Sequence, residues 1–144
     1  MSVFQIQRKS DKQDFLLLQT QSGPEGLALA KQCSLLSGLN EDGNFPFLQT
    51  IEVLEFKGKL FIVLEHLKTA VSLSRQIFVL AEKENGVIND DDGFCKFTLY
   101  KVAKALEIMH KNNKVHGDLN SRNVLCDPQS GQIRVVTTAT AFST

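Results

Sequence analysis

Short stretches of alternating apolar and polar residues open the chain. Residues 3–7 alternate in this way, and residues 15–19 form a second apolar stretch after a polar segment. Two such stretches joined by a polar turn predict a β-hairpin. Ser22 is then expected to be the N-cap of a helix, because Glu25 completes a capping box and the intervening proline suits a first helical turn. We expect this helix to run to about Leu36.

The middle of the chain carries the clearest β pattern. Residues 47–56 and 60–65 are rich in apolar and β-branched side chains and flank a short turn at residues 57–59, which predicts a second hairpin. Helical spacing of apolar residues follows over residues 72–83, and residues 85–93 are polar and acidic. The sequence therefore predicts a hairpin, a helix and a loop in this order.

A longer helix is predicted over residues 95–109, with Asp92 as its N-cap. Two short strands, residues 124–125 and 133–136, are expected around a turn at residues 127–131. The predicted order is ββαββααββ, an α+β fold. The helix is predicted from one apolar stripe, formed by Cys95, Leu99, Val102, Ala103, Leu106 and Met109.

Composition and charge exclude several classes of protein. Lys plus Arg and Asp plus Glu each number 16, so the chain has no net charge and no basic footprint for nucleic acid. The longest apolar run, residues 60–64, is far shorter than the ~18 residues of a membrane span, and no signal-peptide pattern is visible. Three widely spaced cysteines fit neither a disulfide framework nor a metal knuckle. We expect an intracellular, cytoplasmic protein that inserts into no membrane.

Residues 115–125 carry the most specific pattern of the chain. They read Val-His-Gly-Asp-Leu-Asn-Ser-Arg-Asn-Val-Leu. His116, Asp118 and Asn123 have the spacing of His-Arg-Asp-Leu-x-x-x-x-Asn, so the segment resembles the catalytic loop of protein kinases. In that family the Asp accepts the proton of the substrate hydroxyl and the Asn holds magnesium.

The neighbouring elements strengthen the resemblance. The predicted helix lies just upstream of this loop, and the 44–48 segment resembles the kinase connection before the fourth strand. The resemblance spans roughly residues 3–142 and implies a partial protein kinase-like α+β fold. Residues 1–66 would be a small-lobe part lacking the Gly-rich loop, and residues 67–144 a truncated large-lobe part. The hinge between lobes is expected at Glu65, His66 and Leu67.

Several positions depart from the family pattern. Gln19 stands where we place the strand lysine that neutralises phosphate, and Gln32 lies near the position of its glutamate partner. Thr137 occupies the place of the magnesium-binding aspartate, and a hydroxyl is a poor substitute for a carboxylate. Gly117 replaces the arginine of the loop.

These departures set the functional expectation. We expect no enzyme activity, no cofactor and no metal, with His116, Asp118 and Asn123 kept as structural remnants of the motif. The chain would be a non-catalytic, pseudokinase-like interaction subunit of a larger assembly. The alternatives are a regulatory pseudokinase with weak nucleotide binding at the hinge, a fragment of a longer protein kinase, and an active phosphotransferase that uses Asp118.

A protein partner is expected on the face that the missing C-terminal helices would cover. The resemblance implies that the long helix packs against those helices in a complete kinase domain. An exposed apolar patch on a monomer usually marks a protein interface. The residues predicted for this interface are Phe94, Phe97, Leu106, Thr137 and Thr144.

Overall fold

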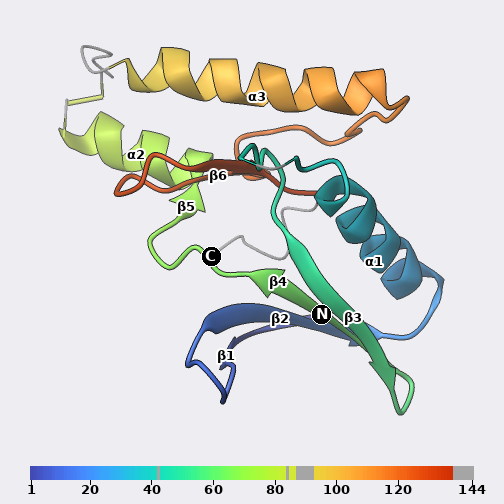
Figure 1. Ribbon diagram of the computed structural model, residues 1–144. Coiled ribbons are helices and arrows are strands. Elements are labelled where there is room, and N and C mark those ends of the chain that lie inside the picture. The colour runs from blue at the N-terminus through green and yellow to red at the C-terminus, as the bar shows by residue number, and fades with distance from the viewer. Residues whose placement is uncertain (42, 84, 87–92, 138–144) are drawn as a thin grey trace. The chain divides into compact units, whose positions relative to one another are not determined.

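A computed structural model describes residues 1–41, 43–83, 85–86 and 93–137 (Figure 1). The chain forms two compact units, Met1–Lys68 and Thr69–Thr144, which are described separately below. The predicted boundary lies between residues 66 and 67, whereas the units meet between Lys68 and Thr69.

The first unit contains a four-stranded antiparallel sheet with the strand order β1-β2-β4-β3. It confirms the two predicted hairpins, and Figure 1 shows β1 and β3 as its outer strands. The strands span Ser2–Gln7 (β1), Asp14–Gln21 (β2), Thr50–Phe56 (β3) and Lys59–Glu65 (β4).

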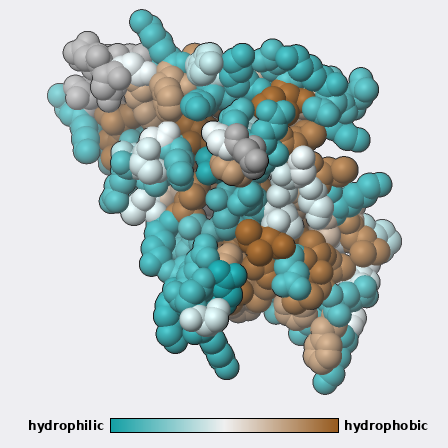
Figure 2. Space-filling view, viewed as in Figure 1, coloured by the Kyte–Doolittle hydropathy of each residue, from teal (hydrophilic) through white to brown (hydrophobic). Residues whose placement is uncertain are grey.

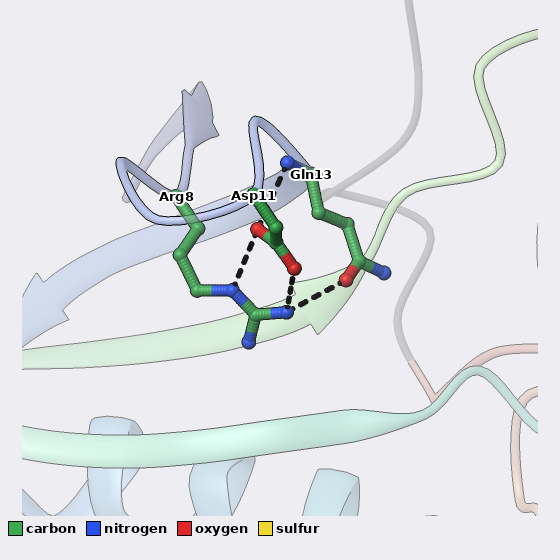
Figure 3. Close-up of polar contacts among 3 residues, drawn as sticks. All are labelled: Arg8, Asp11 and Gln13. Atoms are coloured by element: carbon green, nitrogen blue, oxygen red, sulfur yellow. Dashed lines mark hydrogen bonds and ion pairs between the residues drawn. The ribbon is translucent and has the colours of Figure 1, made fainter.

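Polar contacts define the turn between β1 and β2 (Figure 3). The Arg8 guanidinium donates from Nε to Asp11 Oδ1 at 2.9 Å and from a terminal nitrogen to Asp11 Oδ2 at 2.5 Å. It also donates to the side-chain oxygen of Gln13 at 2.9 Å. The hydrogen bonds from Arg8 lower the pKa of Asp11 to about 2. Because the pair is exposed, it fixes the turn geometry and adds little to stability.

One face of the sheet carries the core of the first unit. Alternation along the strands places Leu18 opposite Ile62, and both side chains are fully buried. Helix α1, Pro24–Ser37, buries Ala30, Cys33 and Leu36. The same face of β2 looks toward α1, because a Cβ atom added to Gly26 would lie 3.0 Å from the Thr20 methyl carbon.

The prediction of Ser22 as the N-cap of this helix is wrong. Gly23 is the N-cap, and it makes no side-chain capping bond. The Ser22 hydroxyl donates instead to the carboxylate of Glu55 on β3. A long-range partner has therefore replaced the local capping bond that the sequence pattern favoured.

The strand predicted over residues 47–56 begins later, at Thr50. The Asn40 side chain accepts from the backbone N–H of Phe47 at 3.1 Å and donates to its carbonyl at 2.9 Å. These two bonds occupy the backbone groups that a ladder would use. Phe47 is fully buried. The segment before β3 is thus a core-filling loop.

The second unit contains a three-stranded antiparallel sheet with the order β5-β6-β7 and two helices. Its core cluster consists of Val124, Cys126 and Ile133, with Leu73, Phe94 and Val102 packed against it. The two-residue strand β5 has no counterpart in the predicted order. The elements span Val71–Ser72 (β5), Leu73–Lys83 (α2), Phe94–Lys111 (α3), Val124–Cys126 (β6) and Ile133–Val135 (β7).

Helix α3 is confirmed, but its buried face differs from the predicted stripe. Thr98, Ala105 and Met109 are its buried residues, whereas Leu99 is 70 % exposed. The predicted stripe is rotated about the helix axis relative to the face that is buried. The spacing of apolar residues predicts a helix, but it does not show which side of the helix packs against the sheet. The predicted cap, Asp92, lies outside the described residues. Within the described chain, none of the helices is long and apolar enough to cross a bilayer.

Candidate catalytic loop

The segment between α3 and β6 carries the kinase-like motif. Its backbone turns at Gly117, which adopts a φ of 80°. L side chains rarely adopt this conformation, and a left-handed residue costs about 1–2 kcal/mol. The structure thereby accounts for the glycine in place of the family's arginine: this loop conformation disfavours any side chain at position 117.

His116 joins the loop to the segment after β7. Its Nδ1 atom accepts the backbone N–H of Asp118 at 3.2 Å. Its Nε2 atom lies 2.6 Å from the carbonyl oxygen of Val136. Since a carbonyl only accepts, Nε2 carries the proton and Nδ1 is the acceptor. Two hydrogen bonds of opposite sense therefore fix the tautomer and orientation of this ring.

Two asparagine amides hold Asp118. The Nδ2 atom of Asn123 donates to the backbone carbonyl of Asp118 at 2.6 Å and reaches its carboxylate at 3.4 Å. The Nδ2 atom of Asn120 approaches the same carbonyl at 3.1 Å and the other carboxylate oxygen at 3.3 Å. The carbonyl bond from Asn123 is the short one, so the backbone is held more firmly than the carboxylate. Asp118 is exposed.

Asn123 is the interior anchor of the loop. It is 0 % exposed, and its carbonyl accepts from the backbone N–H of Val136 at 2.9 Å. Its backbone N–H donates to the carbonyl of Asn120 at 3.0 Å. The Oδ1 atom is buried and has no hydrogen-bond partner in the described part of the chain. Buried polar atoms are rarely left in this state.

A magnesium ion, which the resemblance implies, is a poor fit to these side chains. Magnesium takes oxygen ligands, among them one or two carboxylates. Asp118 supplies one carboxylate, Asn123 an amide oxygen enclosed by protein, and Thr137 a hydroxyl where a carboxylate is expected. Among the described residues no group of three or more His, Cys, Asp or Glu side chains could hold a metal. We therefore derive no step through a metal.

A second polar network lies at the β6–β7 turn, and the sequence did not reveal it. Asp127 accepts from the Thr69 hydroxyl at 2.5 Å, the Ser130 hydroxyl at 2.6 Å and the backbone N–H of Gln129 at 3.0 Å. The bonds from Ser130 and Thr69 lower the pKa of Asp127. The turn was predicted from its composition, but the distant Thr69 contact carries no local signal. Asp127 ties the start of this unit to its last hairpin.

Gln19 and Gln32, the two positions at which the family's lysine and glutamate are expected to be replaced, are not brought together. Gln19 alternates with Leu18 along β2 and lies on the face opposite to the one that looks toward α1. Gln32 lies exposed on α1. The two side chains are thus on opposite sides of the sheet. The neighbouring residue on the α1 face of β2 is Leu18, which is fully buried and uncharged.

The expected hinge residues lie at the end of β4: Glu65 is its last residue, and His66 and Leu67 follow it. The backbone N–H of Glu65 donates to the carbonyl of Gln49, and the Glu65 carboxylate accepts from the N–H of Gln49, both at 3.0 Å. His66 has a buried Nδ1 without a hydrogen-bond partner in the described ranges, and Leu67 is half-buried. Nucleotide binding at these residues stays a prediction.

The residues predicted for an interface have different environments. Phe94 packs against the core cluster of the second unit, so part of its surface is already used. Phe97 is exposed, Leu106 and Thr137 are half-buried, and Thr144 lies outside the described residues. Leu99 and Tyr100 are exposed on α3 and were not predicted to contribute.

Comparison with known proteins decides the family. The protein kinase domain family matches residues 33–137, which is more than half of the chain. The chain belongs to the protein kinase domain family. A search of curated proteins finds no match. This membership confirms the partial kinase-like α+β fold.

Membership also corrects one expectation. A protein kinase domain is a domain of enzymes, so the expectation of no enzyme activity is overturned by the family match. That expectation rested on the departures at Gln19, Gln32 and Thr137 taken together, and on the expectation that the small-lobe part lacks a Gly-rich loop. The motif residues of the loop, in contrast, are present and joined by hydrogen bonds.

Proposed function

We propose that the chain contributes the catalytic loop of a protein kinase, and that Asp118 accepts the proton of the hydroxyl group that is phosphorylated. One observation carries this proposal: the exposed Asp118 is held in its loop by the Asn123 and Asn120 amides, and the loop in turn is tied down by His116. A proton acceptor needs a fixed position and access to its substrate. The contacts to the Asp118 backbone and carboxylate, and the exposure of its side chain, support the proposal.

The reaction is an in-line transfer of the terminal phosphoryl group of a nucleoside triphosphate. The hydroxyl oxygen forms a bond to phosphorus while the bond to the nucleoside diphosphate breaks. The hydroxyl proton passes to the carboxylate of Asp118. Asn123 and Asn120 orient the acceptor through its backbone carbonyl and its carboxylate oxygens. Proton transfer of this kind contributes about 10²–10⁴ to a rate.

The residues described so far provide little positive charge to neutralise the phosphates. Leu18 and Gln19 on β2 are neutral, and so is Thr137. Phosphoryl transfer depends on positioning and on positive charge near the phosphates. The proposal therefore includes the reading that the chain is part of a longer protein kinase, whose further segments supply those charges.

Radiolabelled ATP with magnesium, and a mixture of peptides with Ser, Thr and Tyr hydroxyls, tests the proposal. Transfer by the wild-type chain should fall about 10²-fold or more in Asp118→Asn, which keeps the shape of the side chain and removes the proton acceptor. Asp11→Asn is the matched control, because Asp11 is an exposed carboxylate that lies outside the loop. Equal transfer by wild type and Asp118→Asn would overturn the assignment. If the wild-type chain transfers no phosphoryl group, the chain is not active without further segments of a longer kinase.

A second candidate function is contact with another protein through α3. Its support is the group of exposed apolar side chains on that helix, Phe97, Leu99 and Tyr100. Lys101 lies over the Phe97 ring at 5.5 Å, so a cationic group borders the apolar surface. Phe97→Asp should remove a partner that co-purifies at fixed stoichiometry. Phe78→Asp is the control, because Phe78 is an exposed phenylalanine on α2 with Arg75 over its ring.

A further inference from the structure

One face of the four-stranded sheet points away from α1 and is apolar along its centre. Leu18 and Ile62 are buried on the α1 face, so the odd-numbered residues of β2 and β4 lie on the opposite face. The register of β3 with β4 places the even-numbered residues from Glu52 onward on this opposite face too. We call it the outer face, and its exposed or half-buried apolar residues on these three strands are Leu17, Leu54, Phe56, Phe61 and Val63.

The outer face carries more apolar surface than an open sheet face usually does. Where one side of an antiparallel sheet meets water, polar residues usually occupy that side. Here Leu54 is 47 % exposed and Phe56 is 62 % exposed, and Phe61 and Val63 are half-buried beside them. Figure 2 shows apolar surface over the region of this sheet. Exposed apolar patches rimmed by polar residues mark sites of interaction.

A further strand on this sheet would not cover the outer face. A strand that pairs with an outer strand lies in the plane of the sheet, about 4.8 Å away. It would therefore extend the outer face beside β1 or β3. Only an element that packs on the sheet as a second layer covers these side chains. They need such an element whether or not further strands pair with the sheet.

Charged groups lie at the two ends of the outer face. Lys59 lies opposite Phe56 at the β3–β4 turn, and the Lys57 ammonium lies 5.2 Å from the centre of the Phe56 ring. Glu52 lies on the same face, about 13 Å along the strand from Phe56. None of the ion pairs among the described residues uses these three charged groups. The outer face therefore presents cations at one end and a carboxylate at the other.

We propose that the outer face binds an amphipathic helix of a protein partner. The apolar stripe of this helix packs on Leu54, Phe56 and Phe61. Carboxylates at one end of the helix pair with the lysines at the β3–β4 turn, and a cationic side chain at the other end pairs with Glu52. A helix of about nine residues spans about 13 Å, which is the distance between the charged ends. Docking of an apolar helix face on an apolar surface is a common mode of peptide recognition. The site lies in the first unit and does not rest on the proposed function.

An anionic membrane fits this face less well than such a helix. The chain as a whole carries no net charge, so an anionic surface attracts it only weakly. Anionic headgroups would also repel the exposed carboxylate of Glu52 on the same face. Charges of both signs at fixed ends are instead complementary to a helix that carries both signs.

Two labelled synthetic peptides test the proposal through fluorescence anisotropy with the full chain. Both carry a leucine stripe at helical spacing. The first has two glutamates at one end and a lysine at the other, and the second has lysines at all three positions. The first peptide should bind the wild-type chain at least about tenfold more tightly, because its glutamates pair with Lys57 and Lys59.

Phe56→Ser removes apolar contact surface and should weaken binding of the first peptide at least about tenfold. The matched control is Phe78→Ser, because Phe78 is 54 % exposed on α2 and Arg75 lies 6.0 Å from the centre of its ring. This control should bind the peptide as the wild type does. Leu54→Ser provides a second loss of apolar surface in case Phe56→Ser fails to fold, and circular dichroism compares the folds.

Reversal of the charges at the β3–β4 turn separates specific binding from apolar adhesion. In the double variant Lys57→Glu, Lys59→Glu, both ends of the outer face are acidic. The second peptide should then bind more tightly than the first, because only its lysines meet opposite charges at both ends.

Five results would overturn the proposal. The first two are a wild-type chain that does not bind the first peptide and one that binds both peptides equally. The third is equal affinity of Phe56→Ser and Phe78→Ser for the first peptide. The fourth is displacement of the first peptide by vesicles of phosphatidylserine and phosphatidylcholine, which would make the outer face a membrane site. The fifth is a dimer in sedimentation that Phe56→Ser disrupts, which would make a second copy of the chain the occupant.

Discussion

The sheet of the first unit and the catalytic loop of the second are held by different kinds of contact. In the sheet, fully buried side chains such as Leu18 and Ile62 meet across neighbouring strands. In the loop, His116, Asn120 and Asn123 hold the backbone around Asp118 by hydrogen bonds. Burial of apolar area is non-directional, whereas hydrogen bonds demand a geometry. The sheet therefore supplies stability, and the loop supplies a defined position for one carboxylate.

The largest effect is expected from emptying the core of the first unit. Phe47→Ala should lower its free energy of unfolding by about 3–5 kcal/mol, because Phe47 is fully buried and its loss leaves a cavity. Phe56→Ala is the control. Phe56 is 62 % exposed, so the change should cost less than about 1 kcal/mol. Urea unfolding measures both. Equal losses of unfolding free energy in the two variants would contradict the claim that buried apolar side chains stabilise this sheet.

Gly26→Ala should cost about 2–3 kcal/mol. A Cβ atom at this position would lie 2.2 Å from the carbonyl oxygen of Gln21, so α1 would have to shift away from β2. Gly23→Ala, with nothing within 4 Å of the added atom, is the control and should cost at most about 1 kcal/mol, because alanine is a poorer N-cap than glycine. The same urea titration compares them. A neutral Gly26→Ala would mean that α1 moves freely on the sheet.

A smaller loss is expected in the loop. Asn123→Ala removes the 2.6 Å hydrogen bond to the Asp118 carbonyl. It should cost about 1–2 kcal/mol, because the carbonyl then loses its hydrogen-bond donor. Asn120→Ala removes longer bonds at a less buried site and should cost less than about 1 kcal/mol. Thermal unfolding ranks the two variants. A reversed order would contradict the role of Asn123 as the interior anchor.

The smallest effect is a pH dependence in the second unit. The folded-state pKa of Asp127 lies below its ordinary value because Ser130 and Thr69 donate to its carboxylate. The carboxylate therefore stabilises the fold above the ordinary Asp pKa of about 4, and this contribution is lost as pH falls through the folded-state pKa. Unfolding followed from about pH 6 down to about pH 2 should show the loss. Asp127→Asn should flatten that part of the profile, and an unchanged profile would refute the assignment.

Local patterns predicted most of the fold. The alternation in residues 3–7, the apolar and β-branched residues 60–65 and the helical spacing of residues 95–109 predicted elements that the structure contains. The errors arose where contacts with residues distant in the sequence determine the local structure. Ser22 bonds Glu55 instead of capping α1, Asn40 holds the backbone of Phe47 out of a strand, and β5 forms only because β6 is available.

The candidate site was predictable as a motif but not as a geometry. The spacing of His116, Asp118 and Asn123 singled out the loop from the sequence. The tautomer of His116 and the enclosure of Asn123 depend on Val136, which lies beyond β6 in the chain. Assigning Gln19 to the position of the family's lysine also required knowing which side chains of β2 point toward α1. A shift of one residue moves every side chain of a strand to the other face of the sheet. The departures at Gln19, Gln32 and Thr137, together with the expected lack of a Gly-rich loop, were therefore a weak basis for expecting no activity.

Hydrogen exchange of backbone amides in Asn123→Ala tests the central claim most directly. The account states that the loop around Asp118 is held by its own polar contacts, while the sheet is held by buried apolar side chains. It predicts faster exchange at Asp118 and Val136, whose N–H groups bond to His116 and Asn123, with unchanged protection in β2 and β4. Unchanged exchange at Asp118, or equal loss of protection in β2 and β4, would contradict the account.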